Sequence, residues 1–440
     1  MKKLKLTETF ALMALAFLWL LSGCTKELAK VENSNSKLKF MSGGEKDKLN
    51  AINKTVEGGF IYCGYTVTSQ ANIDAFLLKT DADGNQQWYK TFGGSKYDKF
   101  NQVIQTSDGG FLAVGTSNSY NTGINDTLGH NLDYIVKVDG NGNIAWFKSY
   151  MSTSGEWLQC AESTDGHFYL TGRMSSGTYG AGGVTLLKID NNGNKVYLKN
   201  YSDLTIYPPN LVKSTYYTSG LGIAFAANGA IVIGGVMSKS IFFNEASNLV
   251  SFLMFVNQND GTPSLLMPYY CYVRGFQTNF VQHLQQFKIF PLKDGYLLGT
   301  YFEDNTSGLL CMELIRTNLT GELLWEKKYF GLGQANFMNM EQRPDNTFLL
   351  VGNTSTSQSI SISLPELFYN LKTILIHVDA LGNVLDQVVV GSDKNVIATR
   401  CIQNDGENGW KLAGSISVNE LIYDKMTWCK VDLKGNIIEK

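Results

Sequence analysis

The stretch DGGFLAVG at residues 108–115, followed by YIVKVDGNGNIAW at residues 134–146, decides the fold because both motifs recur along the chain. Copies of the first motif are Glu57-Gly58-Gly59-Phe60, Asp165-Gly166-His167-Phe168, Asn228-Gly229-Ala230-Ile231, Asp294-Gly295-Tyr296-Leu297, Asp345-Asn346-Thr347-Phe348 and Gly406-Glu407-Asn408-Gly409-Trp410. Copies of the second centre on Gly84-Asn85, Gly193-Asn194, Gly261-Thr262, Gly321-Glu322, Gly382-Asn383 and Gly435-Asn436. The motifs alternate, seven copies each, at a period of roughly 50–65 residues, which is in the range of propeller blades.

Each repeat contains four short segments with the composition of strands. The pattern predicts first strands like 100–106, second strands like 111–115, third strands like 76–80 and fourth strands like 86–91. Tight glycine turns between them are typical of antiparallel hairpins. One four-stranded sheet cannot bury both of its faces, whereas seven sheets stacked in a ring can. We therefore expect an all-β fold, a seven-bladed β-propeller of four-stranded antiparallel blades, over residues 39–440.

The clearest repeats are the first three, which have an aromatic residue four residues after the turn glycine, in Trp88, Trp146 and Tyr197. They resemble secreted bacterial propeller repeats of the tryptophan-containing quinoprotein (PQQ-like) type. The later repeats keep the overall motif pattern but differ at individual positions. Asp386, for example, occupies the position that corresponds to Trp88. The regular spacing of Trp88, Trp146 and Trp325 in outer strands predicts packing between blades rather than ligand contact.

The N-terminus has the features of an export signal. A basic segment, residues 1–5, precedes an apolar run over 10–21, which is short for a membrane-spanning helix. Leu21-Ser22-Gly23-Cys24 then resembles the lipobox of bacterial lipoproteins. This resemblance implies that 1–23 is a signal peptide cleaved before Cys24 and that the Cys24 thiol carries a lipid, which anchors the protein to a membrane.

The polar segment 24–38 is expected to be a flexible tether. Thr25 follows the cysteine where aspartate would favour the inner membrane, so by analogy the expected location is the outer membrane, in either leaflet. Asp126-Thr127-Leu128 resembles a short O-glycosylation acceptor used by some Bacteroidetes. Residues 38–40 mirror the start of 89–92, which suggests that the N-terminus adds an outer strand to the last blade.

Charge and cysteine content narrow the function classes. Loss of residues 1–23 would change the net charge from −2 to −4, because that segment carries three lysines and one glutamate. A mildly acidic chain is a poor match for nucleic acid, which requires a basic patch. The other six cysteines are scattered through apolar segments and are predicted to be small buried hydrophobes (Cys63, Cys160, Cys271, Cys311, Cys401 and Cys429).

No metal or cofactor site is predicted. Residues 81–85 resemble a calcium loop, but the glycine is at the fourth position and the loop is too short. Across the seven copies the residue before the glycine varies and includes Leu381 and Lys434, which a turn tolerates and a metal site does not. The chain contains four histidines and neither an HExxH nor a GxSxG motif.

Length variation between repeats indicates where a partner would bind. Turns between first and second and between third and fourth strands are short, whereas the other connections, on the opposite rim, carry the insertions. Loops of variable length on a rigid scaffold commonly carry binding sites. The candidate binding rim comprises Tyr120, Tyr179, Tyr207, Tyr216, Tyr217, Tyr269, Tyr270 and Tyr369. Such rings suit sugars and peptides, although each could also pack its own loop.

Two functions are therefore compared. The first is a membrane-anchored binding or scaffold module that recognises a glycan or an envelope protein through this rim. The alternative is a propeller polysaccharide hydrolase, which requires at least two carboxylates at the mouth of the central channel. A quinoprotein dehydrogenase is a weaker third idea, because that class usually has eight blades.

Overall fold

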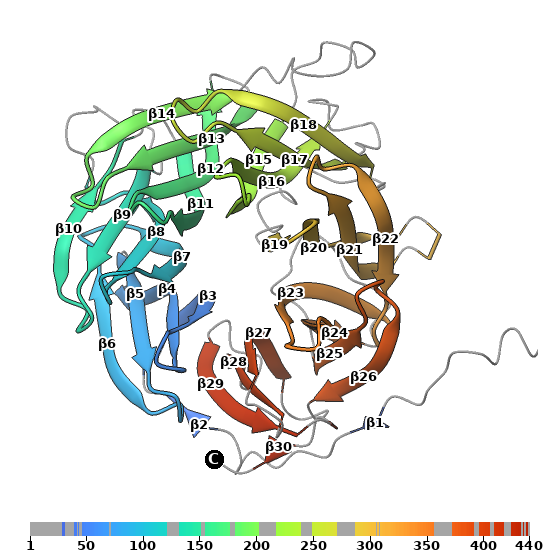
Figure 1. Cartoon of the computed structure of the whole chain (residues 1–440). Coiled ribbons are helices and arrows are strands. Elements are labelled where there is room, and N and C mark those ends of the chain that lie inside the picture. The colour runs from blue at the N-terminus through green and yellow to red at the C-terminus, as the bar shows by residue number, and fades with distance from the viewer. Residues whose placement is uncertain are drawn as a thin grey trace, which may run out of the picture.

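The structure is a computed structural model that describes residues 29–30, 39–41, 43, 46–69, 72–120, 132–150, 155–176, 181–201, 217–238, 249–270, 287–304, 306–307, 309–355, 372–390, 396–404, 409–417, 424–432, 434 and 437–438. Seven antiparallel sheets stand in a ring around an open centre, and each runs from a first, innermost strand to a fourth, outermost strand (Figure 1). The prediction of a seven-bladed β-propeller is confirmed.

The strands follow one another in chain order within each blade. Blade 1 contains β3 (Asp47–Lys54), β4 (Phe60–Ser69), β5 (Asn72–Thr80) and β6 (Gln86–Phe92). Blade 2 contains β7 (Asp98–Gln105), β8 (Phe111–Ser117), β9 (Leu132–Val138) and β10 (Ile144–Lys148). Blade 3 contains β11 (Gly155–Glu162), β12 (Phe168–Ser176), β13 (Ala181–Ile189) and β14 (Lys195–Tyr201). Blade 4 contains β15 (Tyr217–Phe225), β16 (Ile231–Ser238), β17 (Leu249–Val256) and β18 (Pro263–Tyr270).

The second half of the ring repeats the pattern and contains the closure. Blade 5 contains β19 (Lys288–Leu292), β20 (Gly295–Glu303), β21 (Leu310–Asn318) and β22 (Leu323–Tyr329). Blade 6 contains β23 (Gln334–Gln342), β24 (Phe348–Ser355), β25 (Lys372–Val378) and β26 (Val384–Val390). Blade 7 contains β27 (Val396–Asn404), β28 (Trp410–Ser417) and β29 (Asp424–Val431), with β30 (Ile437–Ile438) and β2 (Lys39–Phe40) on its outer edge.

The turn motifs fold as the sequence predicts. Gly142 takes a φ of +76°, a left-handed conformation that favours glycine. Asp139 closes the same turn, since its carboxylate accepts the backbone N–H groups of Asn141 and Asn143, at 2.9 and 2.8 Å. Asp81 makes the corresponding bonds in the segment that resembles a calcium loop. These bonds confirm the turn interpretation of that segment.

The tryptophans of the fourth strands pack between blades, as predicted. The Trp88 indole N–H donates to the Gly140 carbonyl of the next blade at 3.1 Å, and its ring lies edge-on to Phe111 with centroids 5.8 Å apart. A Cβ atom on Gly142 would lie 3.2 Å from the Trp88 ring. Glycine at this position therefore serves both the turn conformation and the contact with the preceding blade.

Truncating one of these rings should open the junction between two blades. We expect Trp88→Ala to lower the free energy of unfolding by about 3 kcal/mol, because the substitution removes a half-buried indole and leaves a cavity. Guanidinium unfolding followed by circular dichroism measures this loss. Ile144→Ala is the control, since Ile144 is 53% exposed in β10, and it should change stability by less than about 0.5 kcal/mol. Equal losses for the two variants would contradict the packing role.

The cysteines also lie where the sequence predicts. Cys63, Cys160, Cys311, Cys401 and Cys429 are buried thiols. Burial raises the pKa of the Cys401 thiol to about 11 and that of Cys429 to about 12, so these groups are inert near neutral pH. Five of the six are thus confirmed as small buried hydrophobes, and Cys271 lies outside the described residues.

The ring closes through a divided outer strand. Ile437 and Ile438 pair with the end of β29, and Lys39 and Phe40 continue the same edge opposite Trp428 and Thr427. In register, Lys39 matches Lys90 of blade 1, which pairs with Leu77. The expected N-terminal addition to the last blade is therefore present (Figure 1).

One further contact involves the segment expected to be a tether. Ala29 and Lys30 form β1 and pair in parallel with Val388 and Val389, on the outer edge of blade 6. Cys24 and the proposed signal peptide, 1–23, lie outside the described residues, so the lipid and the boundary at 38 stay predictions. Among the described residues, no helix is long and apolar enough to span a membrane.

Candidate functional site: the central channel

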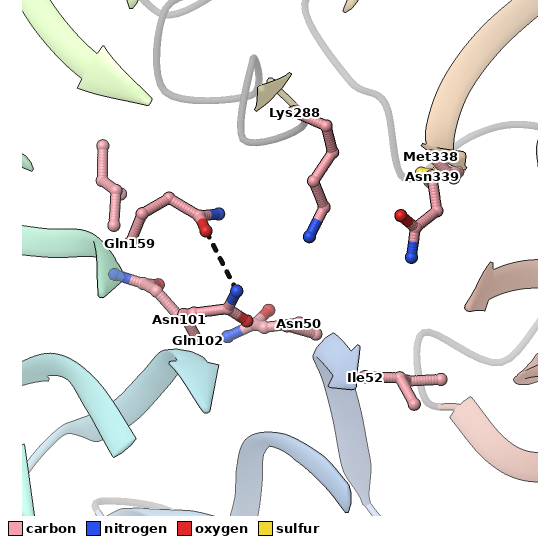
Figure 2. A pocket seen from close by; sticks show the side chains of 10 residues that line it. Asn50, Ile52, Asn101, Gln102, Gln159, Lys288, Met338 and Asn339 are labelled. Carbon is pink, nitrogen blue, oxygen red and sulfur yellow. Dashed lines mark hydrogen bonds between the residues drawn. The ribbon is translucent and has the colours of Figure 1, made fainter. Parts of the chain in front are cut away.

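The first strands surround the channel, and most carry a bulge there. The register shifts by one residue at Asn50, Asn101, Leu158, Leu221, Met338 and Arg400. A bulge bends its strand and redirects neighbouring side chains, and bulges are common beside functional sites. Two consecutive residues of several blades therefore line the channel, for example Asn101 with Gln102 and Leu158 with Gln159 (Figure 2).

One register position of the first strand is shared by all seven blades, and in the six bulged strands it follows the bulge directly. In blade order it is occupied by Ala51, Gln102, Gln159, Gly222, Lys288, Asn339 and Cys401. The lining thus combines small side chains with amides and one lysine. The cavity at this level is about 20 Å³, room for about one water molecule.

Backbone bonds fix which way two of the channel amides face. The Val103 N–H donates to Gln102 Oε1 at 3.1 Å, and the Met340 N–H donates to Asn339 Oδ1 at 2.9 Å. Gln102 Nε2 then donates to Gln159 Oε1 at 2.9 Å. Because Gln102 Oε1 and Gln159 Oε1 accept protein donors, Gln159 Nε2 and the second N–H of Gln102 Nε2 are donors that can face the channel.

Lys288 supplies the positive charge of the channel. Its side chain extends from β19 into the space between Gln159 and Asn339 (Figure 2). Among the described residues its ammonium has no hydrogen bond or ion pair. Burial lowers the pKa of Lys288 below its usual 10.5, and the charge of Lys54 acts in the same direction. A bound anion would relieve this desolvation.

Hydrogen-bond acceptors are fewer in the channel. Asn50 and Asn101 donate their amide N–H groups to the next blade, at Phe100 O and Trp157 O, over 2.7 and 2.8 Å. The Asn101 Oδ1 atom is buried without a partner among the described residues. An unpartnered buried acceptor is costly unless water or a ligand donates to it. The lining therefore offers several donors, one cation and at least one acceptor.

A buried ion cluster supports this wall between blades 2 and 3. Glu156 is 7% exposed and lies 3.5 Å from Lys99, and it also pairs with Arg173. Burial alone would raise the pKa of Glu156, but Lys99, Arg173 and a bond from Asn101 hold it below 4.5. The cluster fixes Asn101 at the channel, since the Asn101 amide contacts both Glu156 and Trp157.

The structure places the predicted rim tyrosines unevenly. Tyr120 stacks on Tyr134 of β9 at 5.5 Å and donates its hydroxyl to Gly93 O, between blades 1 and 2, at 2.7 Å, so both its ring and its hydroxyl have partners within the protein. Tyr269 is in β18 rather than in a loop, 5% exposed, with its hydroxyl on Gly321 O of the next blade. Four others lie outside the described residues (Tyr179, Tyr207, Tyr216 and Tyr369). For Tyr217 and Tyr270 the structure describes only the backbone, at the ends of β15 and β18.

The channel amides were not among the residues proposed from sequence. A signal was nevertheless present, because Asp47-Lys48-Leu49-Asn50 and Asp98-Lys99-Phe100-Asn101 place an asparagine at the same point of two repeats. The bulge that turns this position toward the axis cannot be recognised from the sequence pattern.

Comparison with known proteins supports the fold and no finer assignment. No family model matches the sequence, and neither does any curated protein. Among solved structures, a polysaccharide lyase of family PL25, an ulvan lyase, is similar, with a TM-score of 0.52, 10% identity and coverage of 89% of this chain and 95% of that one. The structure of a PL25 ulvan lyase bound to -[GlcA(1-4)Rha3S]- is similar with a TM-score of 0.50 and 9% identity, and the match covers 93% of this chain and 96% of that one. The β-propeller domain of the trilobed protease from Pyrococcus furiosus has a TM-score of 0.47 and 7% identity, and the match covers 90% of this chain and 96% of that one.

Proposed function

We propose that this protein is an exported, lipid-anchored binding protein whose propeller captures an acidic glycan at its central channel. The observation that carries the proposal is the donor-rich lining, in which Lys288 and the amides of Gln102 and Gln159 line one water-sized cavity that a ligand's anionic group could occupy. A carboxylate or sulfate would pair with Lys288, and sugar hydroxyls would bond with the amides and with Asn101 Oδ1. The long connections of the predicted binding rim would hold the rest of the chain.

The hydrolase alternative is less well supported by this lining. Acid–base hydrolysis of a glycosidic bond requires two carboxyl groups on either side of the sugar. The described residues that line the channel space include amides, apolar side chains and Lys288, without a carboxylate. Glu341, on the innermost strand of blade 6, is paired with Lys54 at 3.0 Å. Binding is therefore the role that the geometry favours.

A binding measurement with matched lysine variants tests the proposal. Isothermal titration with acidic polysaccharides (alginate, pectate, ulvan) and with a neutral one (dextran) should detect binding of acidic chains only, weakened by salt. Lys288→Ala should lower affinity at least tenfold, because a charge-assisted contact is lost. Lys288→Arg should keep most of the affinity. Lys195→Ala, exposed on outer strand β14, is the control and should leave binding unchanged.

Two results would overturn the acidic-glycan role. One is equal binding of acidic and neutral chains, and the other is full affinity in Lys288→Ala. Release of shorter sugars from any polysaccharide would instead favour the enzymatic alternative.

The proposed anchor rests on Cys24 and requires its own test. In a bacterial host the full chain should fractionate with membranes and incorporate labelled palmitate, with outer-membrane fractions the expected site. Cys24→Ser should abolish the label and release the protein from the membrane fraction. Label that persists in Cys24→Ser would contradict lipid attachment at this residue.

A further inference from the structure

At six of the seven blade junctions an aromatic ring packs against the turn glycine of the next blade. The rings, in blade order, belong to Trp88, Trp146, Tyr197, Phe255, Trp325 and Trp428, each with ring atoms 2.5–3.2 Å from the position of a Cβ on that glycine. Blade 4 has Leu265 at the usual place, and Phe255 of the neighbouring strand supplies the ring instead. The contact is thus maintained even where the residue that makes it changes strand.

Among the described residues, blade 6 supplies no such ring, and the corresponding turn glycine of blade 7, Gly435, lies outside them. At the register of Trp88 it has Asp386, opposite His377, where blades 1, 2, 3 and 5 pair a lysine or arginine with an aromatic residue. An open pocket of about 220 Å³ lies here between blades 6 and 7. The pocket is therefore where the repeat itself would seat an aromatic ring.

The walls of the pocket are suited to a flat apolar group. Leu349, Leu375, Val388 and Trp410 line it and are each less than 7% exposed. Trp410 begins β28, at the position where Phe111 receives the Trp88 ring in blade 2. A ring that entered this space would thus meet an indole where the other junctions present a phenyl or aliphatic group.

Polar groups lie at the edge of the same pocket. Arg343 stacks its guanidinium over Trp410 at 5.1 Å, and its Nη1 lies 3.3 Å from His377 Nε2. The Arg343 Nε–H is buried and has no partner among the described residues. The Asp386 carboxylate is exposed and accepts the backbone N–H of Gln387 at 2.8 Å. The pocket therefore presents one unsatisfied donor and an anionic acceptor.

We propose that this pocket is a binding site for an aromatic ring of phenol or indole size that carries an O–H or N–H group. The ring would stack beside Trp410, and its polar hydrogen would bond to Asp386, as the Trp88 indole N–H bonds to Gly140 O elsewhere. A phenol oxygen would also accept from Arg343 Nε. The same chemistry belongs to a free metabolite or to the side chain of a partner polypeptide, and the two sources are separated in the test.

The test places in the pocket the tryptophan that blades 1, 2 and 5 carry at the position of Asp386. Ligand-observed NMR titration should show saturable binding of indole and p-cresol to the wild type, with toluene at least fivefold weaker. Asp386→Trp should abolish binding and raise the melting temperature, because the introduced indole fills the space as at the other junctions. Asp386→Phe repeats the test with a smaller ring. Val384→Ala is the matched control, since Val384 is 47% exposed on the same strand and its truncation should leave indole binding unchanged.

Defined outcomes decide the proposal. Absence of indole and p-cresol binding to the wild type, up to their solubility, overturns it. Undiminished binding by folded Asp386→Trp or Asp386→Phe overturns the location. A tyrosine-containing tetrapeptide that binds at least tenfold more tightly than p-cresol would identify a polypeptide as the source, and equal affinities would identify a small molecule. These measurements do not depend on glycan binding, so either proposal can fail alone.

Discussion

Removal of residues 1–41 is expected to lower the free energy of unfolding by about 4 kcal/mol relative to removal of residues 1–38. The two variants differ only by Lys39, Phe40 and Met41, which complete the outer edge of blade 7. Met41 is 7% exposed, and its burial accounts for about 2 kcal/mol of the loss. The remaining loss comes from hydrogen bonds and from the exposed edge of β29.

The hydrogen bonds explain why three residues have so large an effect. The Met41 N–H donates to Met426 O at 3.1 Å, and the Lys39 ammonium donates to Asp83 O of blade 1 at 3.0 Å and also to Asn85. Lys39 therefore joins the last blade to the first, as Lys90 joins blade 1 to Asn143 of blade 2 at 2.7 Å. Without it, the ring is closed by the contact of Trp428 with Gly84 and by packing of the inner strands.

Chemical unfolding of both soluble variants measures the difference. A change of less than about 1 kcal/mol between them would contradict a closing role for 39–41. Comparison of the 1–38 deletion with one that ends at residue 24 measures what β1 adds on blade 6. Because β1 lies between Cys24 and residues 39–41, a pull on a lipid-linked N-terminus would load β1 before the closure strand.

The sequence was sufficient for the architecture because the fold is a repeat. Turn glycines such as Gly142 and inter-blade rings such as Trp88 interact with the same neighbour in each copy, so their roles could be predicted from spacing alone. The N-terminal strand was found for the same reason, since Lys39 matches Lys90 in register. Local patterns that repeat are predictable because their tertiary partners repeat as well.

The candidate sites depend on departures from the repeat, which have no second copy to compare. Gln102, Gln159 and Lys288 belong to three blades and meet only because the ring brings their bulged strands to one axis. Asp386 was recognised as a missing tryptophan. The pocket beside Asp386 is also formed by Trp410, 24 positions later in the chain, and by Arg343 from a turn of the same blade. Contacts between non-matching positions require the structure.

Replacement of Glu156 by glutamine is expected to lower the free energy of unfolding by about 3 kcal/mol near pH 7. The substitution keeps the shape of the side chain and removes its charge. Arg173 and Lys99 would then share a buried site with no anion to balance them. Breaking one member of a buried ion cluster costs more than the net value of the cluster, because the remaining charges stay desolvated. Glu326→Gln, exposed on β22, is the control and should have little effect.

The pKa of Glu156 determines the direction in which this loss of stability changes with pH. The pKa of Glu156 is held below 4.5 in the folded state, despite burial, by Lys99 and Arg173. Its contribution to stability is therefore complete above the unfolded value and declines as pH falls through the folded value. The difference between wild type and Glu156→Gln should be constant from pH 6 to 8 and shrink below about pH 4.5. Thermal unfolding across this range checks it, and a difference that grows toward low pH would contradict the assignment.

Glu156 also links stability to the proposed site. The Asn101 amide donates to Trp157 O at 2.8 Å and approaches Glu156 Oε2 at 3.3 Å, so the carboxylate helps to hold the channel wall. If the wall binds an acidic glycan, folded Glu156→Gln should bind it several-fold more weakly, although residue 156 is not among the residues that line the channel space. The salt dependence of binding should stay that of the wild type, because Lys288 is untouched. A changed salt dependence with unchanged affinity would instead place Glu156 in the long-range field of the channel and not in the support of its wall.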